Sequence, residues 1–175
     1  MTRMRRLLVL LPLLLAGAAG AQRHNSDAPI NFAANTIELQ DRANRGVLSG
    51  DVRVTQADLT LTSDRLTVAY TGQVLEGSPQ VSRLDAAGDV VVRRPDQTAR
   101  ANYAVYDLNR RLITMVGDVT LNEGANRING GRLTINLDTG RAVIDGSAVG
   151  GGAAAGDAQR RGGRVTGTFS VPERQ

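Results

Sequence analysis

Apolar and polar residues alternate one by one over much of the chain between residues 30 and 149. Val52 and Val54 flank Arg53, and residues 133–137 repeat this pattern with three aliphatic side chains. Successive side chains of a strand point to opposite faces, so a period of two predicts strands with one buried and one solvated face. Clusters of Asp, Asn, Thr and Gly, such as 138–140, separate these runs. No stretch after residue 21 has a convincing helical period, so the predicted fold class is all-β.

The alternating segments belong to a repeat of 29 residues. A Gly-Asp-Val tripeptide occurs at 50–52, 88–90 and 117–119, and the centre of a second strand-like phrase follows each glycine 16 positions later. A further glycine follows each phrase centre 13 positions later. The exception is the first centre, Leu66, where the interval to the next glycine is nine residues longer. A fixed period of this size is typical of stacked supersecondary units. The longer interval predicts an insertion at 73–80, between two strands.

Each Gly-Asp pair admits two interpretations. A glycine within an alternating strand marks a bulge or a sharp bend. Asp51, Asp89 and Asp118 have the opposite phase to the valines that follow them, so we expect them on the outer face, bonded to nearby amides. The alternative is a row of catalytic or calcium-binding carboxylates. Calcium-binding repeats carry more carboxylates per turn, so we favour the structural role and predict no metal site.

The first 21 residues are predicted to be a secretory signal peptide. Three arginines precede an apolar run at 7–15 and a small-residue run that ends at Ala21. This order predicts cleavage between Ala21 and Gln22. The apolar run is short for a bilayer span of about 20 residues, and an uncleaved N-terminal anchor is the alternative. Export of a chain without cysteine fits the bacterial periplasm.

Charge and composition exclude several classes of function. All 21 basic residues are arginines, and loss of the three in the signal peptide leaves 18 against 17 acidic residues, a net charge of +1. The strongly basic surface of a nucleic-acid-binding protein is therefore not expected. With no cysteine, one histidine (His24) and 3% aromatic residues, disulfides, Cys-ligated metals, histidine triads and aromatic sugar platforms are disfavoured. We predict neither a cofactor nor enzymatic activity.

The domain organisation follows from the repeat and a later change in composition. Residues 22–149 form one β domain. Residues 150–163 are rich in Gly, Ala and Arg and are predicted to be a loop. Alternation at 164–171 predicts one final strand within the terminal segment 164–175, and a disordered tail is the alternative.

Three phrases carry a resemblance to a known family: ANTIEL at 34–39, GVLSGDV at 46–52 and DLTLTSDRL at 58–66. With the period, the chain length and the signal peptide, they resemble the OstA-like family of periplasmic lipopolysaccharide-transport proteins of the LptA type, over about residues 28–149. The resemblance implies a semi-open β-jellyroll, or β-taco, of two facing antiparallel sheets with lipid A bound between them. The insertion and the segment at 150–163 depart from the family pattern and leave the C-terminal docking surface open.

The resemblance also implies partners. A head-to-tail homo-oligomer would join a bitopic component of the inner-membrane export complex to the N-terminal periplasmic domain of the outer-membrane translocon. Unpaired sheet edges would dock through β-augmentation, and we place them near Pro29–Leu39 and Leu133–Val149. The arginine pairs at 93–94, 110–111 and 160–161 could meet lipid phosphates, but their loop contexts favour solvated turns.

The side chains that the repeat places on the inner face form the predicted lipid-binding lining. It is aliphatic, of mixed size and without directional donors, as lipid tails require, although the same face could close on itself. The predicted lipid-binding residues are Ile37, Leu39, Leu48, Val52, Val54, Leu59, Leu61, Leu66, Val68, Val90, Val92, Tyr106, Met115, Val119, Leu121, Leu133, Ile135 and Ile144.

Two other classes of protein remain as alternatives. A self-assembling structural β-solenoid without ligand would have a tightly closed interior. A polysaccharide-acting β-helix enzyme would need converging carboxylates and aromatic platforms. The scarcity of aromatic residues and the outward phase of the aspartates count against the enzyme.

Overall fold

The computed structural model describes residues 24–72, 79–146 and 164–170. These residues form ten strands and one short 3-10 helix. In chain order they are β1 (Ile30–Ala33), β2 (Thr36–Gln40), η1 (Asp41–Ala43), β3 (Arg45–Gln56), β4 (Leu59–Thr71), β5 (Gln80–Arg94), β6 (Gln97–Asp107), β7 (Leu112–Glu123), β8 (Asn126–Asn136), β9 (Ala142–Asp145) and β10 (Thr166–Thr168).

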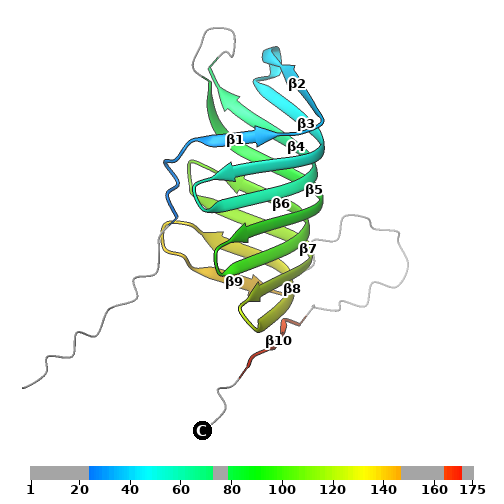
Figure 1. The fold of residues 1–175 in the computed structure, drawn as a ribbon, viewed down its shortest axis with the longest axis vertical. Helices are drawn as coiled ribbons and strands as arrows, with labels where there is room; N and C mark the ends of the chain where they lie inside the picture. The colour runs from blue at the N-terminus through cyan, green and yellow to red at the C-terminus, as the bar shows by residue number, and fades with distance from the viewer. Residues whose placement is uncertain (1–23, 73–78, 147–163, 171–175) are drawn as a thin grey trace, which may run out of the picture.

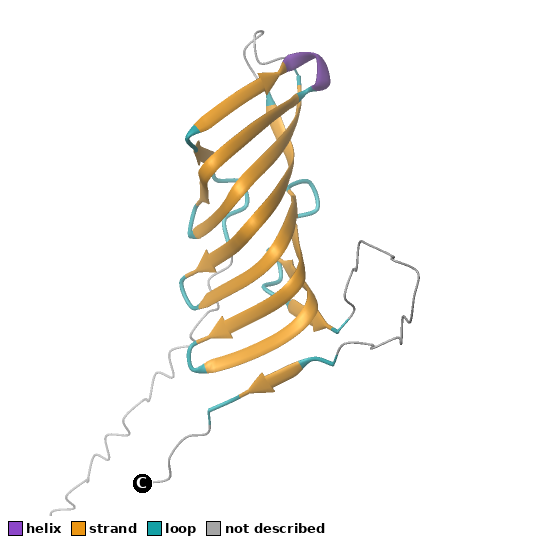
Figure 2. Cartoon of the chain, turned by 90° about the vertical axis from the view of Figure 1, so that its right-hand side faces the viewer, coloured by secondary structure: helices purple, strands orange, loops and turns teal. Residues whose placement is uncertain are grey.

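All ten strands belong to one antiparallel sheet. Its order is β1-β3-β4-β5-β6-β7-β8-β10, with β2 also paired to β3 and β9 also paired to β8. Strands that follow one another from β3 to β8 are therefore neighbours in space. Figure 1 shows them stacked in chain order along the long axis of the molecule, and Figure 2 shows the same stack from the side, with η1 at one end. The prediction of an all-β repeat fold is confirmed.

The Gly-Asp pairs interrupt the strand pairing as β-bulges. The register between β3 and β4 jumps from Ser49 to Val52, and equivalent jumps occur at the other two pairs. Gly117 has φ +83° and Asp118 has φ +48°, both in the left-handed region. A Cβ added to Gly117 would lie 2.8 Å from Nδ2 of Asn102. Glycine is therefore needed both for its backbone angle and for the close approach of Asn102.

The bulges divide the sheet into two limbs. Limb 1 contains β1, β10 and the β3–β4, β5–β6 and β7–β8 turns. Limb 2 contains β2, β9 and the β4–β5, β6–β7 and β8–β9 connections. β1 pairs with β3 on one side of its bulge (Ala33 opposite Arg53), and β2 pairs on the other side (Thr36 opposite Ser49). The two facing sheets that the resemblance implied are therefore two limbs of one folded sheet. The ends of the two limbs meet on one side of the molecule. We call this side the mouth.

The core lies between the limbs and follows the predicted alternation. Val52 and Val54 are 1% and 2% exposed, whereas Arg53 between them is exposed. Leu48 and Leu66 of limb 2 belong to the same hydrophobic cluster as these valines of limb 1. One continuous core therefore joins the two limbs.

Two of the three bulge aspartates, Asp51 and Asp118, bond to side-chain amides, as the structural interpretation proposed. At the third bulge, the side chain beside Gly88 is the carboxylate of Asp64 in place of an asparagine amide. Nδ2 of Asn35 donates to Asp51 at 3.3 Å, and Nδ2 of Asn102 donates to Asp118 at 3.2 Å. Each asparagine lies 16 positions before its aspartate; Asn102 is on the neighbouring strand β6, and Asn35 lies between β1 and β2. Within the described ranges, no group of three His, Cys, Asp or Glu side chains is arranged to hold a metal ion.

Several predicted segments lie at or beyond the limits of the description. Residues 1–21, 150–163 and most of the 73–80 insertion are outside the described residues. Within 164–171, β10 occupies Thr166–Thr168 and pairs with β8, and Phe169 next to it is 64% exposed. Among the residues described, none forms a helix long and apolar enough to cross a membrane.

Candidate functional site

The interior between the limbs contains most of the predicted lipid-binding residues. Fifteen of the eighteen are at most 6% exposed and belong to one cluster: Leu48, Val52, Val54, Leu59, Leu61, Leu66, Val68, Val90, Val92, Tyr106, Met115, Val119, Leu121, Leu133 and Ile135. Ile144 is half-buried against them. The middle of this interior is therefore closed by its own side chains in this conformation.

Ile37 and Leu39 differ from the other predicted residues because they are 52% and 59% exposed. Both lie on β2, the edge strand of limb 2. Ile37 is opposite Leu48 and Leu39 is opposite Gly46, so both side chains share the phase of the core. They extend the apolar face beyond the closed interior.

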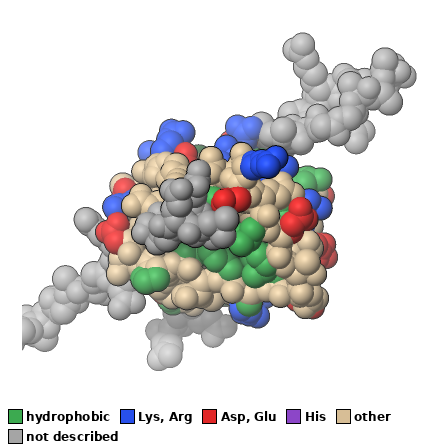
Figure 3. Space-filling model, turned by 90° about the horizontal axis from the view of Figure 1, so that it is seen from above, with side chains coloured by type: hydrophobic (Ala, Val, Ile, Leu, Met, Phe, Trp, Pro, Cys, Tyr) green, Lys and Arg blue, Asp and Glu red, His purple; other side chains and the backbone are tan. Residues whose placement is uncertain are grey.

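An apolar groove opens at this β2 end. Its volume is about 210 Å³, and its lining comes from β1–β4 and the start of β5: Phe32, Ile37, Leu39, Gly46, Leu48, Val68, Tyr70, Pro79 and Val81. Seen from this end, hydrophobic side chains gather at the centre of the molecule (Figure 3). Leu48 and Val68 belong to both the groove and the core, so the groove floor is continuous with the interior.

One polar group stands at the edge of the groove. The Tyr70 hydroxyl lies 3.4 Å from Oδ1 of Asp41 in η1. Burial, together with the nearby Asp41 carboxylate, raises the pKa of Tyr70 above its ordinary value. The hydroxyl therefore stays protonated at neutral pH, and its ring contributes an apolar wall.

The strand phase also identifies core residues that the predicted lining omitted. Leu84, Ile113 and Leu137 are at most 1% exposed and belong to the same cluster. Each lies two positions from another core residue on its segment, so the alternation could have found all three. Phe32 of the groove was also omitted, since β1 is too short to show a clear period. Tyr70 was omitted although it continues the phase of Leu66 and Val68 on β4, so the alternation could have found it.

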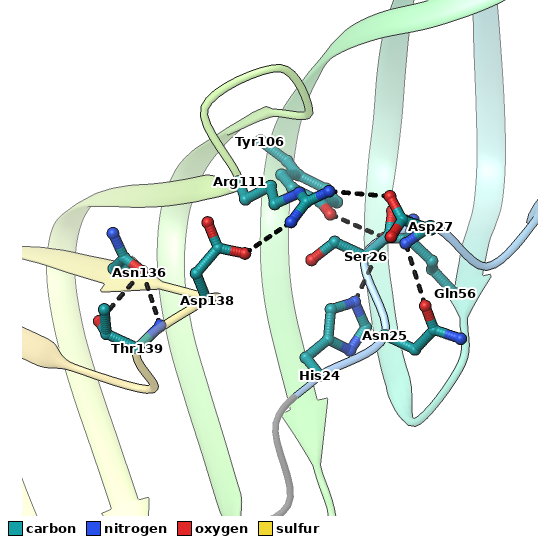
Figure 4. Close-up of polar contacts among 10 residues, drawn as sticks. All are labelled: His24, Asn25, Ser26, Asp27, Gln56, Tyr106, Arg111, Asn136, Asp138 and Thr139. Atoms are coloured by element: carbon teal, nitrogen blue, oxygen red, sulfur yellow. Dashed lines mark hydrogen bonds and ion pairs between the residues drawn. The ribbon is translucent and has the colours of Figure 1, made fainter.

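The mouth contains a polar network that sequence reasoning did not find. The Gln56 side chain, 2% exposed, contacts His24 and Tyr106, and Arg111 contacts Asp27 (Figure 4). Burial raises the pKa of Tyr106, so its hydroxyl remains a donor to Gln56. The only sequence signal was Gln56 itself, a polar residue in the buried phase of β3.

Among the described residues, the pair Arg110–Arg111 lies in a turn, as expected, but the expectation is wrong for Arg93 and Arg94, which are the last two residues of β5. Arg111 binds Asp138 at 3.0 Å and Asp27 at 2.8 Å, and these carboxylates raise its pKa. The backbone of Arg110 donates to Asp107 within the β6–β7 turn. Arg93 is exposed on the outer face of β5. In the described conformation, the Arg111 guanidinium is therefore engaged by protein carboxylates. The pair at 160–161 lies outside the described residues.

Residues 31–141 match the family described as LptA/(LptD N-terminal domain) LPS transport protein. The chain belongs to this family. Its members are transport proteins and not enzymes, in agreement with the predicted lack of enzymatic activity. An uncharacterised protein of Rhizobium meliloti (strain 1021) is 30% identical over 145 residues, covering 75% of this chain and 78% of that protein.

A solved structure supports the fold assignment of this family member. LptH of Pseudomonas aeruginosa, described as the LptA-homologous periplasmic component of a lipopolysaccharide transport device, superposes with a TM-score of 0.67. The match covers 85% of this chain and 99% of LptH at 16% identity. The chain is thus an LptA-type lipopolysaccharide transport protein with the corresponding β fold.

Proposed function

We propose that the protein is a periplasmic lipopolysaccharide-binding bridge, which holds the acyl chains of lipid A along its apolar interior. The groove at the β2 end carries this proposal, because it presents exposed Ile37 and Leu39 and continues into the core. Its lining offers apolar contact with few directional donors, which suits acyl chains. The predicted signal peptide is the further reason to place the protein in the periplasm.

The energetics explain why such a groove is needed. Exposure of one CH₂ to water costs about 0.8 kcal/mol, so a chain of a dozen carbons costs about 10 kcal/mol. A glycolipid with several such chains cannot cross an aqueous compartment unprotected. A sequence of apolar grooves removes this barrier without covalent chemistry.

The ends of the sheet suit the docking that a bridge requires. β1 and β2 form one edge, and β9 and β10 form the other. An edge strand pairs with a further strand through its free backbone groups. In this proposal, copies of the chain join head to tail, one end of the assembly meets a bitopic inner-membrane component, and the other meets the periplasmic domain of the outer-membrane translocon.

Photo-crosslinking at neighbouring positions of β2 tests the lipid site. A photo-reactive residue at Leu39, in the groove, should capture lipid A in a Gram-negative periplasm. The matched control is Glu38, which is also exposed but has the opposite strand phase. Equal capture at the two positions would refute the groove assignment.

A second candidate function is a structural β-solenoid without ligand. The closed interior favours it, since Leu66, Met115 and Leu133 are 0% exposed. Mass spectrometry of the protein purified from the periplasm separates the two candidates. Co-purified lipid A supports transport, whereas lipid-free protein that still forms ordered polymers supports the solenoid.

A further inference from the structure

The N-terminal segment His24–Ala28, which we call the strap, contacts both limbs at the mouth. It runs into β1, and its side chains contact the β3–β4 turn of limb 1 and the β6–β7 turn of limb 2. Figure 4 shows the strap beside Gln56 of limb 1 and beside Tyr106 and Arg111 of limb 2. The strap is therefore placed to hold the two limbs together.

Gln56 is the centre of this arrangement. Its Nε2 donates to the carbonyl oxygens of Ser26 and Ala28, at 2.8 and 3.1 Å. These two acceptors fix the orientation of the amide, so Oε1 must point the other way. Oε1 accepts from the Tyr106 hydroxyl at 2.7 Å. One buried side chain of limb 1 thereby binds both the strap and limb 2.

His24 fastens the strap to limb 1. Its side chain is 0% exposed, with Nδ1 at 2.5 Å from Oδ1 of Asp58 and Nε2 at 3.3 Å from Oε1 of Gln56. Both ring nitrogens face oxygen acceptors, so both donate when the imidazole is protonated and paired with the Asp58 carboxylate. A buried histidine held by two side chains is a specific anchor.

Arg111 fastens the strap to limb 2. Its two terminal nitrogens divide between Asp27 of the strap and Asp138 of the β8–β9 turn, at 2.8 and 3.0 Å. These groups are partly exposed, so this contact is weaker and more readily exchanged with water than the His24 anchor. The limb 2 side of the strap is thus the one that opens first.

We propose that the strap is a latch, which keeps the mouth closed and must release before acyl chains enter the interior from the side. The closed core makes release necessary, since fifteen of the predicted lining residues are at most 6% exposed. The link to acyl chains rests on the proposed function. The latch itself is a property of this chain and can be tested without lipid.

Thiol labelling measures opening of the mouth in the absence of lipid. The chain has no cysteine, so Val54→Cys introduces a single buried thiol on limb 1. Adding His24→Ala should raise its labelling rate by a maleimide about tenfold, since it removes the buried anchor. The exposed neighbour Arg53→Cys should label at the same rate with or without His24→Ala. An unchanged rate at Val54→Cys would overturn the latch.

Locking the strap tests side entry. In an Asp27→Cys, Arg111→Cys variant, a short reducible bis-thiol reagent would tie the strap to limb 2, across the contact that opens first. Locking should slow capture of lipopolysaccharide by a photo-reactive residue at Leu61 about tenfold, and a reductant should restore it. Capture that is unaffected by locking would refute side entry. If labelling responds to His24→Ala but no form captures lipid, the latch stands and the proposed lipid function fails.

Discussion

Substitution of Gly117 by alanine should destabilise the fold through contact with Asn102. At Gly117, a new Cβ would lie 2.8 Å from Nδ2 and 3.1 Å from Cβ of Asn102. The residue also has φ +83°, where a side chain costs about 1–2 kcal/mol. Displacing Asn102 would break its bond to Asp118, at a further cost of about 0.5–1.5 kcal/mol. We expect Gly117→Ala to cost about 2–3 kcal/mol in total.

Gly124, in the β7–β8 turn, provides the matched control. It also has a positive φ, of 55°, but an added Cβ there meets no atom within 4 Å. Gly124→Ala should therefore lower the free energy of unfolding by about 1 kcal/mol, which is the cost of the backbone conformation alone. Urea unfolding, extrapolated to zero denaturant, measures both free energies.

A double variant isolates the contact. In an Asn102→Ala background the amide is gone and only the Cβ contact at 3.1 Å remains, so the cost of Gly117→Ala should fall towards that of Gly124→Ala. Equal costs of Gly117→Ala and Gly124→Ala in the otherwise unchanged chain would refute the reasoning. The bulge would then need only the backbone freedom of glycine.

Three further predictions concern the core, the mouth and the groove. Leu66→Ala should cost about 2–5 kcal/mol in urea unfolding, because Leu66 is 0% exposed, whereas Thr67→Ala should cost less than half of that. Burial raises the pKa of Tyr106 above 10.0, so the folded state holds this proton more tightly and the free energy of unfolding should fall as the pH rises past this value. Tyr106→Phe should lessen this fall in melts across that range, and an identical fall would exclude Tyr106 as its source. Leu39→Asp should reduce lipopolysaccharide capture with little loss of stability, since Leu39 is 59% exposed; normal capture by this variant would remove Leu39 from the site.

Strand phase accounts for how much of the fold could be predicted. The alternation around Val54 and Leu133 assigned the inner face correctly, and the Gly-Asp pairs marked the bulges. The predicted lipid-binding residues did not include Phe32 of the groove, because this residue lies on a strand of only four residues. A period of two needs more residues than that to be distinguished from chance.

The closure of the interior and the strap could not be predicted in the same way. An aliphatic inner face is compatible with either an open or a closed pair of limbs, and only the distance between the limbs decides this. The strap depends on contacts between residues at least 28 positions apart, such as Ala28 with Gln56. A polar residue in a buried phase indicates that a partner exists, but does not identify it.

The pairing of each strand with its neighbours in the chain makes the length of the molecule adjustable. From β3 to β8, every strand pairs with the strands before and after it in sequence. Adding one hairpin with its own Gly-Asp bulge would lengthen the stack by two strand spacings, about 10 Å, without new contacts elsewhere. Extra residues between Thr71 and Gln80, which are paired, are accommodated with one register shift close by, between Ala69 and Tyr70. Evolution can therefore change the reach of such a protein by duplicating a hairpin, while the chemistry of its interior stays the same.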